Sequence, residues 1–340
     1  MTIIKWGILG TANIALTRTI PFMAKVECAS AEAIASRDLG KAKQAAQDLN
    51  IPKAYGSYEA LLADATIDAV YVPLPNNLHR EWSIKAMEAG KHVLCEKPLS
   101  LLPEDVRAVI EARDRTGRHI EEGFGYKNHP QWDKIDALMA ENAIGKPLST
   151  HGVLAMRFMN PDDIRNSPEL GGGGTYDLGS YAISASTMIF RRPPLRVLGV
   201  MDQDPEFRID RLSTAILDYG DAHSTFTVST QGGAAAWATH QHFSVLGSHG
   251  WLRCDFPYAQ ARPSACHLFV GDLQSYGGFE TQKFDFPAVS QYGLEVERFS
   301  RHLLGEDVKT WELEDALLTL TIIQELFASA RSDSWREIKV

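Results

Sequence analysis

The sequence Gly7-Ile8-Leu9-Gly10-Thr11-Ala12-Asn13-Ile14-Ala15 joins an apolar, strand-like run to a stretch with helical periodicity. A junction of this kind at the start of a βαβ unit is where the dinucleotide fingerprint G-x-G-x-x-G lies. The three glycine positions here carry Gly10, Ala12 and Ala15, and small residues let the turn close and let the backbone approach a pyrophosphate. An ordinary tight turn fits the same residues. The nucleotide is favoured because the stretch begins a longer series of strands and helices.

That series runs from Ile3 to about Phe124, where short apolar runs alternate with helical patterns. The alternation is typical of repeated βαβ units and a parallel sheet. Beyond Tyr126 the pattern changes to longer alternating strands separated by turn residues. We therefore expect an α/β Rossmann domain over residues 1–123, and an α+β substrate-binding domain with a large, mostly antiparallel, open sheet over residues 124–340. The helical patterns within 295–330 are expected to cover that sheet or to pack back on the first domain.

The composition is that of a globular enzyme or binding protein, because 44% of the 340 residues are hydrophobic and 23% are charged. The formal net charge of -9 provides no basic surface for a phosphate backbone, so we expect no nucleic-acid partner. Four well-separated cysteines without a CxxC pair fit a reducing cytoplasm. The N-terminal residues do not have the pattern of a signal peptide, and the apolar stretch at 316–327 contains Gln324 and Glu325. We therefore expect no membrane partner.

The end of the second predicted strand indicates which dinucleotide would bind. An acidic residue at this position binds the adenosine ribose hydroxyls of NAD and repels a 2′-phosphate. Ser36 can donate a hydrogen bond to a phosphate and Arg37 can supply positive charge, whereas Asp38 would favour NAD if it pointed at the ribose. The balance favours NADP(H) over NAD(H). Further cofactor contacts are expected from the fingerprint turn itself, at Gly10, Thr11, Ala12, Asn13 and Ile14.

Two later segments also follow predicted strands, so they should lie at the carboxyl ends of the sheet, over the cofactor crevice. They are Val72-Pro73-Leu74-Pro75-Asn76-Asn77-Leu78-His79 and Gly90-Lys91-His92-Val93-Leu94-Cys95-Glu96-Lys97-Pro98-Leu99. The order of fingerprint, P-N-x-x-H element and Glu-Lys-Pro element resembles the Gfo/Idh/MocA family of oxidoreductases. The resemblance covers nearly the whole chain. Its most specific element is Glu96-Lys97-Pro98.

The resemblance implies roles for residues in both segments. Lys97 would be the catalytic or substrate-orienting lysine, and Glu96 would face the nicotinamide ribose. Pro73, Asn76 and His79 would line the cofactor side, and the peptide bond after Lys97 would be cis. Independently of the family, an ammonium near nicotinamide can hydrogen-bond an alkoxide-like oxygen. A histidine at a helix start is more often a structural hydrogen-bonder, so His79 is the weaker candidate.

In the second domain, the glycine run Gly171-Gly172-Gly173-Gly174 leads into a predicted helix with Asp177 and Tyr181 on one face. By spacing alone they would be a helix-start charge and a core aromatic. The segment resembles the family element G-G-G-x-x-x-D-x-G-x-H/Y. Tyrosine in the last place resembles the branch with glucose-fructose oxidoreductase, NADP-linked xylose dehydrogenase and dimeric dihydrodiol dehydrogenase. The resemblance implies that Tyr181 exchanges a proton beside Lys97 and that Asp177 binds a substrate hydroxyl or tunes its neighbours.

Two shorter elements agree with that branch. Asp163-Ile164-Arg165 resembles its N/D-I-R element, in which Arg165 would bind substrate or close the loop. Tyr126-Lys127-Asn128-His129-Pro130 resembles its Y-R-x-x-P element, which makes Tyr126 a substrate-binding candidate. Lys127 replaces the usual arginine and cannot make a planar bidentate contact, so substrate anchoring there would be altered.

These features predict an NADP(H)-dependent oxidoreductase that moves a hydride between nicotinamide C4 and a CH-OH or C=O carbon of a sugar or polyol-like substrate. The alternative is a catalytically silent dinucleotide-sensing regulator, which the joint presence of Lys97, Asp177 and Tyr181 disfavours. A semialdehyde or amino-acid dehydrogenase is disfavoured because the only cysteine near the crevice, Cys95, lies in a strand where core packing explains it. His240 and His242 share a strand face without further ligands, so we predict no metal site. The resemblance also implies a homodimer through the open sheet.

Overall fold

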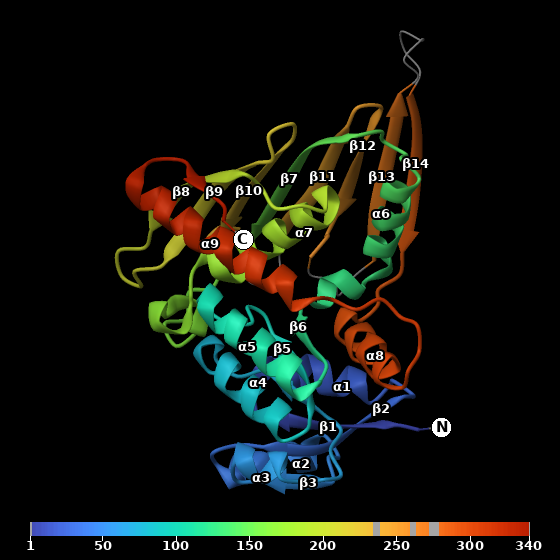
Figure 1. Cartoon of the computed structure of the whole chain (residues 1–340), viewed down its shortest axis with the longest axis vertical. Coiled ribbons are helices and arrows are strands. Elements are labelled where there is room, and N and C mark those ends of the chain that lie inside the picture. Colours follow the sequence, from blue (N-terminus) through green and yellow to red (C-terminus); the bar gives the residue numbers. More distant parts are fainter. Residues whose placement is uncertain (1, 234–238, 259–262, 272–278, 340) are drawn as a thin grey trace. The chain divides into compact units, whose positions relative to one another are not determined.

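The chain folds into two compact units, each described by itself (Figure 1). The structure is a computed structural model that describes residues 2–233, 239–258, 263–271 and 279–339. The first unit comprises Met1–Asn128 with Ser290–Leu317, and the second comprises His129–Val289 with Leu318–Val340. A late segment of the chain, residues 290–317, thus belongs to the first unit.

The first unit contains a six-stranded parallel sheet in the order β3-β2-β1-β4-β5-β6. The direction of winding reverses between β1 and β4, and ligands of such sheets bind beyond the carboxyl ends of the strands at this point. The predicted Rossmann fold is confirmed. The strands are β1 (Ile4–Leu9), β2 (Ala29–Ala35), β3 (Lys53–Tyr55), β4 (Ala69–Val72), β5 (His92–Glu96) and β6 (Ile120–Gly123).

Helical segments connect these strands, and their ends follow local sequence signals. Helix α5 begins at Pro103, whose missing N–H costs nothing in the first turn, and stops at Gly117, which has a φ of 62°. The helical segments of this unit are η1 (Ala15–Thr19), α1 (Ile20–Met23), α2 (Leu39–Asp48), α3 (Tyr58–Leu62), η2 (Asn76–Leu78), α4 (His79–Glu88), α5 (Pro103–Thr116), η3 (Gly125–Asn128) and α8 (Gln291–Leu303).

Helix α8 completes the core of the first unit although it follows β1 by almost 300 residues. It lies beside α1 (Figure 1). The fully buried ring of Trp6 packs 5.2 Å from the ring of Phe299, and its Nε1 donates a hydrogen bond of 3.1 Å to Ser300 Oγ. On the opposite face of β1, a Cβ at Gly7 would collide with Leu61 of α3. Both faces of the central strand are therefore covered by helices.

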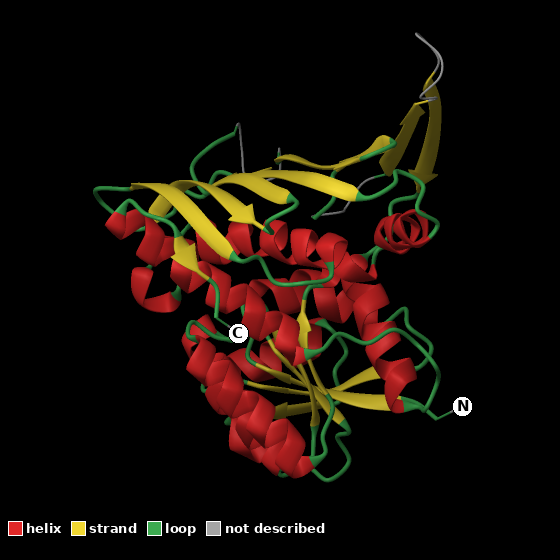
Figure 2. Cartoon of the chain, turned by 45° about the horizontal axis from the view of Figure 1, so that its top comes forward, coloured by secondary structure: helices red, strands yellow, loops and turns green. Residues whose placement is uncertain are grey.

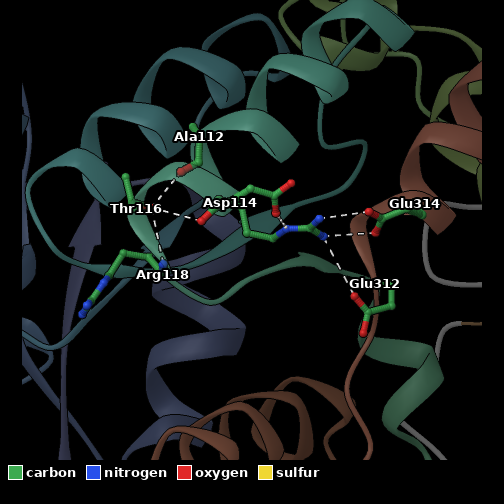
Figure 3. Close-up of polar contacts among 7 residues, drawn as sticks. Ala112, Asp114, Thr116, Arg118, Glu312 and Glu314 are labelled. Carbon is green, nitrogen blue, oxygen red and sulfur yellow. Dashed lines mark hydrogen bonds and ion pairs between the residues drawn. The ribbon is translucent and has the colours of Figure 1, made fainter.

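An arginine on α5 binds the segment that follows α8. The guanidinium of Arg113 donates two hydrogen bonds, of 3.1 and 3.0 Å, to the carboxylate of Glu314. Glu312 lies 3.9 Å away, and Asp114 accepts a further bond from Nε (Figure 3). A two-point contact between guanidinium and carboxylate fixes direction as well as distance. It attaches residues 312–314 to the first unit.

The second unit contains a nine-stranded sheet in the order β14-β13-β12-β11-β7-β10-β9-β8-β15. All neighbouring strands are antiparallel except β7 and β10. The predicted mostly antiparallel sheet is confirmed. Its strands are β7 (Pro147–Ala155), β8 (Arg196–Gln203), β9 (Asp210–Asp218), β10 (His223–Ser229), β11 (His240–Gly247), β12 (Gly250–Asp255), β13 (Ser264–Gly271), β14 (Phe279–Phe286) and β15 (Arg336–Glu337).

The helices of the second unit lie on one face of this sheet (Figure 2). Gly152 of β7 and Gly199 of β8 allow close approach, since a Cβ there would lie 3.2 Å from Ala182 and 3.0 Å from the Leu326 carbonyl oxygen. The remaining helical segments of the chain are α6 (Pro130–Ala140), η4 (Ile164–Asn166), η5 (Pro168–Leu170), η6 (Thr175–Gly179), α7 (Ser180–Phe190) and α9 (Leu313–Ser332), which crosses the boundary between the units. In the described part of the chain, no helix has the length and apolar character that crossing a membrane requires.

The opposite face of the nine-stranded sheet exposes large apolar side chains. Val200, on the β8 position next to inward Gly199, is 68% exposed. Leu246 and Trp251 are opposite each other on β11 and β12 and are 51% and 39% exposed. The Trp251 ring stacks on Phe269 of β13 at 3.6 Å. This open face combines exposed apolar surface with the regular backbone of a sheet.

Candidate functional site

The fingerprint turn has the conformation that a dinucleotide needs. Gly10 has a φ of 107°, which disfavours a side chain, and a Cβ there would lie 2.9 Å from Leu74. Its N–H donates to the Ala35 carbonyl, so the turn is tied to β2. The helix begins directly after the turn, at Asn13. Uncapped backbone N–H groups at a helix start bind phosphate, so this turn fits the pyrophosphate of a dinucleotide.

The structure resolves the opposing signals at the end of β2. Asp38 Oδ1 accepts hydrogen bonds from the backbone N–H groups of Gly40 and Lys41, at 2.8 and 3.2 Å, and so caps α2. The carboxylate is thereby directed to the helix. Arg37 is exposed and lies against the Tyr58 hydroxyl, where it opposes the rise in the pKa of Tyr58 caused by burial. Ser36 and Arg37 are the residues at this strand end that suit a 2′-phosphate.

His79 lies behind the loop after β4 and has no exposed surface. Its Nε2 contacts the Leu74 carbonyl oxygen at 2.7 Å, and its Nδ1 contacts the Pro98 carbonyl oxygen at 2.8 Å. Both ring nitrogens therefore contact backbone carbonyl oxygens, one in each of the two loops. In the same loop Pro73 is buried and Asn76 is half-buried.

The turn after β5 presents Glu96 and Lys97, both half-buried, at the carboxyl end of the sheet. The peptide bond between Lys97 and Pro98 is cis, as predicted. Glu96 accepts a hydrogen bond from the Tyr71 hydroxyl, which in turn accepts one from Thr19. Burial and the neighbouring Glu96 carboxylate both raise the pKa of Tyr71, so this phenol remains a donor and fixes Glu96.

The segment after β6 places Tyr126 in the interior. The ring of Tyr126 has no exposed surface and meets Phe124 edge-on at 5.7 Å, so we expect it to contribute packing. Lys127 is only 3% exposed. Its Nζ lies 4.9 Å from the ring of Trp311 and 3.7 Å from Asp315 Oδ2. A lysine in place of arginine is thus accommodated as a buried cation between an aromatic ring and a carboxylate.

In the second unit, the structure brings together three residues that the sequence singled out. Arg165 Nε donates a hydrogen bond of 2.7 Å to Asp177 Oδ2, and its Nη1 lies 3.3 Å from Asp163 Oδ1. The guanidinium lies 4.4 Å over the ring of Phe158. Asp177, then Asp163, raise the pKa of Arg165, while its burial opposes them. Asp177 is therefore held in one orientation by a permanent cation.

The glycine run is shaped by Asp210, a residue that the sequence did not single out. A Cβ at Gly172 would collide with the Arg165 backbone, and one at Gly173, where φ is 108°, would collide with the Asp210 carboxylate. Asp210 Oδ2 accepts hydrogen bonds from both the backbone N–H and the hydroxyl of Thr175, each at 2.6 Å. An acid at the first position of β9 has no local signal that relates it to Thr175. Gly173 is therefore required because the run closes around this carboxylate, and Gly172 because the run passes close to the Arg165 backbone.

Tyr181 lies in the first turn of α7, half-buried, with its ring 5.8 Å from that of Tyr258. The π-helical turn η6 leads into α7, as η1 leads into α1. Such turns are rare and occur frequently at functional sites. Asp177 and Tyr181 belong to the second unit and Lys97 to the first. The candidate residues of the second unit thus lie in and just after a π-helical turn that follows a glycine run. Lys97 of the first unit instead follows the end of a strand.

His240 and His242 lie on the open sheet face, where a third histidine joins them. The ring of His242 is 5.3 Å from that of His151 and 5.9 Å from that of His240. Burial, followed by the charges of these two neighbours, lowers the pKa of His242. Within the ranges that the structure describes, no group of three or more histidine, cysteine or acidic side chains could hold a metal ion.

Comparison with known proteins shows similarity over almost the whole chain. The model of an oxidoreductase family with an NAD-binding Rossmann fold matches residues 4–124, and that of the GFO/IDH/MocA C-terminal domain matches residues 132–253. An uncharacterized oxidoreductase of Rhizobium meliloti is 39% identical over 99% of this chain and 100% of its own length. A D-xylose 1-dehydrogenase (NADP(+)) of Haloferax volcanii is 34% identical over 98% of this chain and 99% of its own.

Solved structures show the same two-unit architecture. A 3-ketoreductase from Actinomadura kijaniata, in complex with NADP and TDP-benzene, superposes with a TM-score of 0.85. It is 25% identical and covers 96% of this chain and 98% of its own. Both family models match, and two relatives above 30% identity cover nearly the full length. The chain therefore belongs to the Gfo/Idh/MocA family of NAD(P)-dependent oxidoreductases.

Proposed function

We propose that this protein is an NADP(H)-dependent dehydrogenase or reductase that moves a hydride between nicotinamide C4 and a CH-OH or C=O carbon of a sugar or polyol. The observation that carries the proposal is the position of Lys97, on the turn at the carboxyl end of β5 in the sheet that also carries the fingerprint turn. Bound NADP would supply the hydride acceptor or donor. The Lys97 ammonium would hydrogen-bond the reacting oxygen.

Residues of the second unit would complete the chemistry. Tyr181 would give or take the proton of the reacting hydroxyl. Asp177 would bind a neighbouring substrate hydroxyl, because a carboxylate accepts hydrogen bonds and Arg165 holds this one in a fixed orientation. The Actinomadura reductase has been solved with a lysine replaced and with a tyrosine replaced. Those two residues are separated by the same number of positions as Lys97 and Tyr181, which supports pairing these roles.

The preference for NADP(H) over NAD(H) rests on the end of β2. The Asp38 carboxylate is engaged by the first turn of α2, so it is not the ribose-binding acid of NAD enzymes. Ser36 and Arg37 would bind the 2′-phosphate. The xylose dehydrogenase is named for NADP(+), and the ketoreductase was solved with NADP, which supports this preference.

The experiment is a turnover assay with the full-length protein, NADP+ or NAD+, and a panel containing D-xylose, D-glucose and polyols. We expect reduced nicotinamide absorbance to rise with NADP+ and at least one aldose. Lys97→Ala and Tyr181→Phe should each lower kcat by about 10²–10⁴-fold. Tyr176→Phe is the matched control, because this neighbouring phenol is bound by Gln324 of α9. Unchanged turnover in Lys97→Ala would overturn the mechanism, and NADP+ binding without turnover of any compound would favour the sensor.

We also propose a homodimer that associates through the open face of the nine-stranded sheet, and a cytoplasmic location. The exposed apolar side chains on that face support the dimer. The four cysteines are free thiols, which supports a reducing compartment. The net charge of -9 supports the absence of a nucleic-acid partner.

A further inference from the structure

Two buried side chains hold the backbone of the turn that carries Lys97. From β6, Glu122 Oε1 accepts a hydrogen bond of 2.8 Å from the backbone N–H of Leu99. From the start of α4, His79 Nδ1 contacts the carbonyl oxygen of Pro98 at 2.8 Å. Glu122 is 8% exposed and His79 is fully buried. These contacts hold the two residues that directly follow Lys97.

The parallel register of β5 and β6 directs Glu122 to this turn. Cys95 of β5 is paired with Glu122, and Glu96 is paired with Gly123. A Cβ at Gly123 would lie 3.1 Å from the Cys95 carbonyl oxygen and 3.3 Å from Glu96 Cα, so β6 lies close against the end of β5. The preceding residue, Glu121, bonds His119 at 2.8 Å. Glu121 is therefore a neighbouring acid with a different hydrogen-bond partner from that of Glu122.

The charges around Glu122 link its ionisation to Lys97. Burial raises the pKa of Glu122 to about 7, whereas the Leu99 N–H and the ammonium groups of Lys127 and Lys97 favour its carboxylate. Asp315 acts in the opposite direction. The carboxylate form gives Leu99 a charge-assisted acceptor and gives Lys97 an anionic neighbour. Both effects are lost when Glu122 is protonated.

The surroundings of His79 favour its neutral form. Burial lowers the pKa of His79, the carbonyls of Pro98 and Leu74 raise it, and the charge of Lys97 lowers it. A neutral imidazole can donate to one of the two carbonyl oxygens, and an imidazolium can donate to both. The imidazolium therefore joins the loop after β4 to the loop after β5 by two hydrogen bonds, whereas the neutral ring donates to one carbonyl and packs against the other.

We infer that Glu122 and His79 are positioning residues for Lys97, because they hold the backbone of Pro98 and Leu99 from two sides. The inference rests on the proposed role of Lys97. Neither residue needs to touch substrate. Misplacement of a reacting group by about 1 Å can lower a rate about 10²-fold. Contacts that fix two peptide groups next to Lys97 can therefore change kcat.

The first test needs no substrate. Amide hydrogen exchange of the full-length protein is measured at Leu99 in the wild type, Glu122→Ala, Glu122→Gln and the control Glu121→Gln. Loss of the acceptor in Glu122→Ala should speed exchange at Leu99 by about tenfold or more, whereas Glu122→Gln keeps an amide oxygen and most of the protection. The circular dichroism spectrum of Glu122→Ala shows whether the variant is folded. If it is folded and exchange at Leu99 is unchanged, Glu122 does not hold this backbone position, whether or not an aldose is turned over.

The second test separates positioning from general destabilisation. With NADP+ and the aldose that gives turnover, Glu122→Ala should lower kcat by about tenfold or more and leave the KM for NADP+ within about threefold. The wild-type pH profile of kcat should have an inflection near pH 7 that Glu122→Gln lacks. In a Lys97→Ala background, Glu122→Ala should cause no further loss, because both changes act on one group. Additive losses, or an inflection retained in Glu122→Gln, would overturn the role in positioning Lys97.

The contribution of His79 is tested with two variants of different donor capacity. His79→Phe fills the site without a donor, and His79→Gln keeps an N–H that can reach one carbonyl. We expect kcat to fall in His79→Phe and to be partly restored in His79→Gln, with faster amide exchange in the segment 96–101 for the first variant only. Equal kcat values in the two variants would show that the ring acts by packing alone.

Discussion

Arg37 and Asp38 are adjacent in the sequence but have different partners. The Asp38 carboxylate binds the first turn of α2, and Arg37 remains exposed beside Tyr58. A single sequence cannot distinguish these alternatives, because an acid at the end of β2 serves equally as a helix cap or as a ribose ligand. In the structure the backbone N–H groups of Gly40 and Lys41 bind the Asp38 carboxylate, which makes it a helix cap.

This assignment gives a prediction for cofactor selectivity. Arg37→Ala should weaken NADPH binding by about tenfold or more, because a charge-assisted contact to the 2′-phosphate is lost, and should leave NADH binding within about twofold. Titration of nicotinamide fluorescence measures both dissociation constants. Asp38→Asn is the matched control, since asparagine also caps helices, and it should keep the ratio of the two constants. A ratio that shifts toward NADH in Asp38→Asn, with no change in Arg37→Ala, would contradict the assignment.

Glu122 also makes stability depend on pH. Its pKa is about 7 in the folded protein against 4.5 for the free side chain. The folded state therefore holds this proton more tightly, so the free energy of unfolding should fall as pH rises from about 4.5 to 7. The full cost above pH 7 is roughly 3 kcal/mol. Urea unfolding at pH 5 and pH 8 should show that Glu122→Gln gains stability relative to the wild type at the higher pH. An equal difference at both pH values would contradict the prediction.

At the scale of elements, Asp210 supports the start of the helix that carries Asp177 and Tyr181. Its Oδ2 accepts from the Thr175 N–H, the Thr175 hydroxyl and the Ser213 hydroxyl, all buried. Asp210→Ala removes this shared acceptor and leaves only the hydrogen bond from the Thr175 hydroxyl to the Ser213 hydroxyl, so it should lower the free energy of unfolding by about 2–4 kcal/mol. The exposed Asp202 of β8, which binds Arg211, provides the control Asp202→Ala, with an expected loss below about 1 kcal/mol. Urea titration compares the two, and equal losses would contradict the supporting role of Asp210.

Sequence patterns predict elements better than they predict their long-range partners. The alternation of strands and helices up to Phe124 predicts the parallel sheet. Pro103 and Gly117 account for the bounds of α5, because their backbone preferences act locally. The hydrogen bonds from Thr175 to Asp210 could not be predicted, since the sequence around a single acidic residue in a strand does not indicate which distant residue it contacts. Helical periodicity likewise predicts that α8 is amphipathic, but not that its apolar face covers Trp6.

The same limit applies to the candidate site. The motifs identified Lys97, Asp177, Tyr181 and Arg165, and the structure joins the last of these to Asp177. The roles of Glu122 and His79 depend on contacts with backbone atoms of Pro98 and Leu99, which no side-chain pattern specifies. Catalytic side chains are visible in a sequence because their chemistry restricts residue type. The residue types that can hold a loop in place depend on where the loop backbone runs, and this is known only from the folded structure.

For the whole molecule, the proposed dimer gives a prediction about the open sheet face. Val200→Glu combined with Leu246→Glu would place charges on two of its exposed apolar positions. We expect sedimentation velocity to show a dimer for the wild type and a monomer for the double variant, because unpaired charges oppose burial in an interface. NADPH binding should be retained, since both residues lie in the second unit. A matched pair on an exposed helix surface, Glu111→Lys with Asp114→Lys, should leave the dimer intact.

The return of residues 290–317 to the first unit has a consequence for biosynthesis. The ribosome releases β1 and its Trp6 first, but Phe299 and Ser300, which cover that ring, are made almost 300 residues later. At a translation rate of about 5–20 residues per second, this interval lasts roughly 15–60 seconds. During that time the apolar face around Trp6 lacks its final cover. Apolar surface exposed during synthesis is prone to aggregate, so the first unit can complete its core only late although most of it is encoded first.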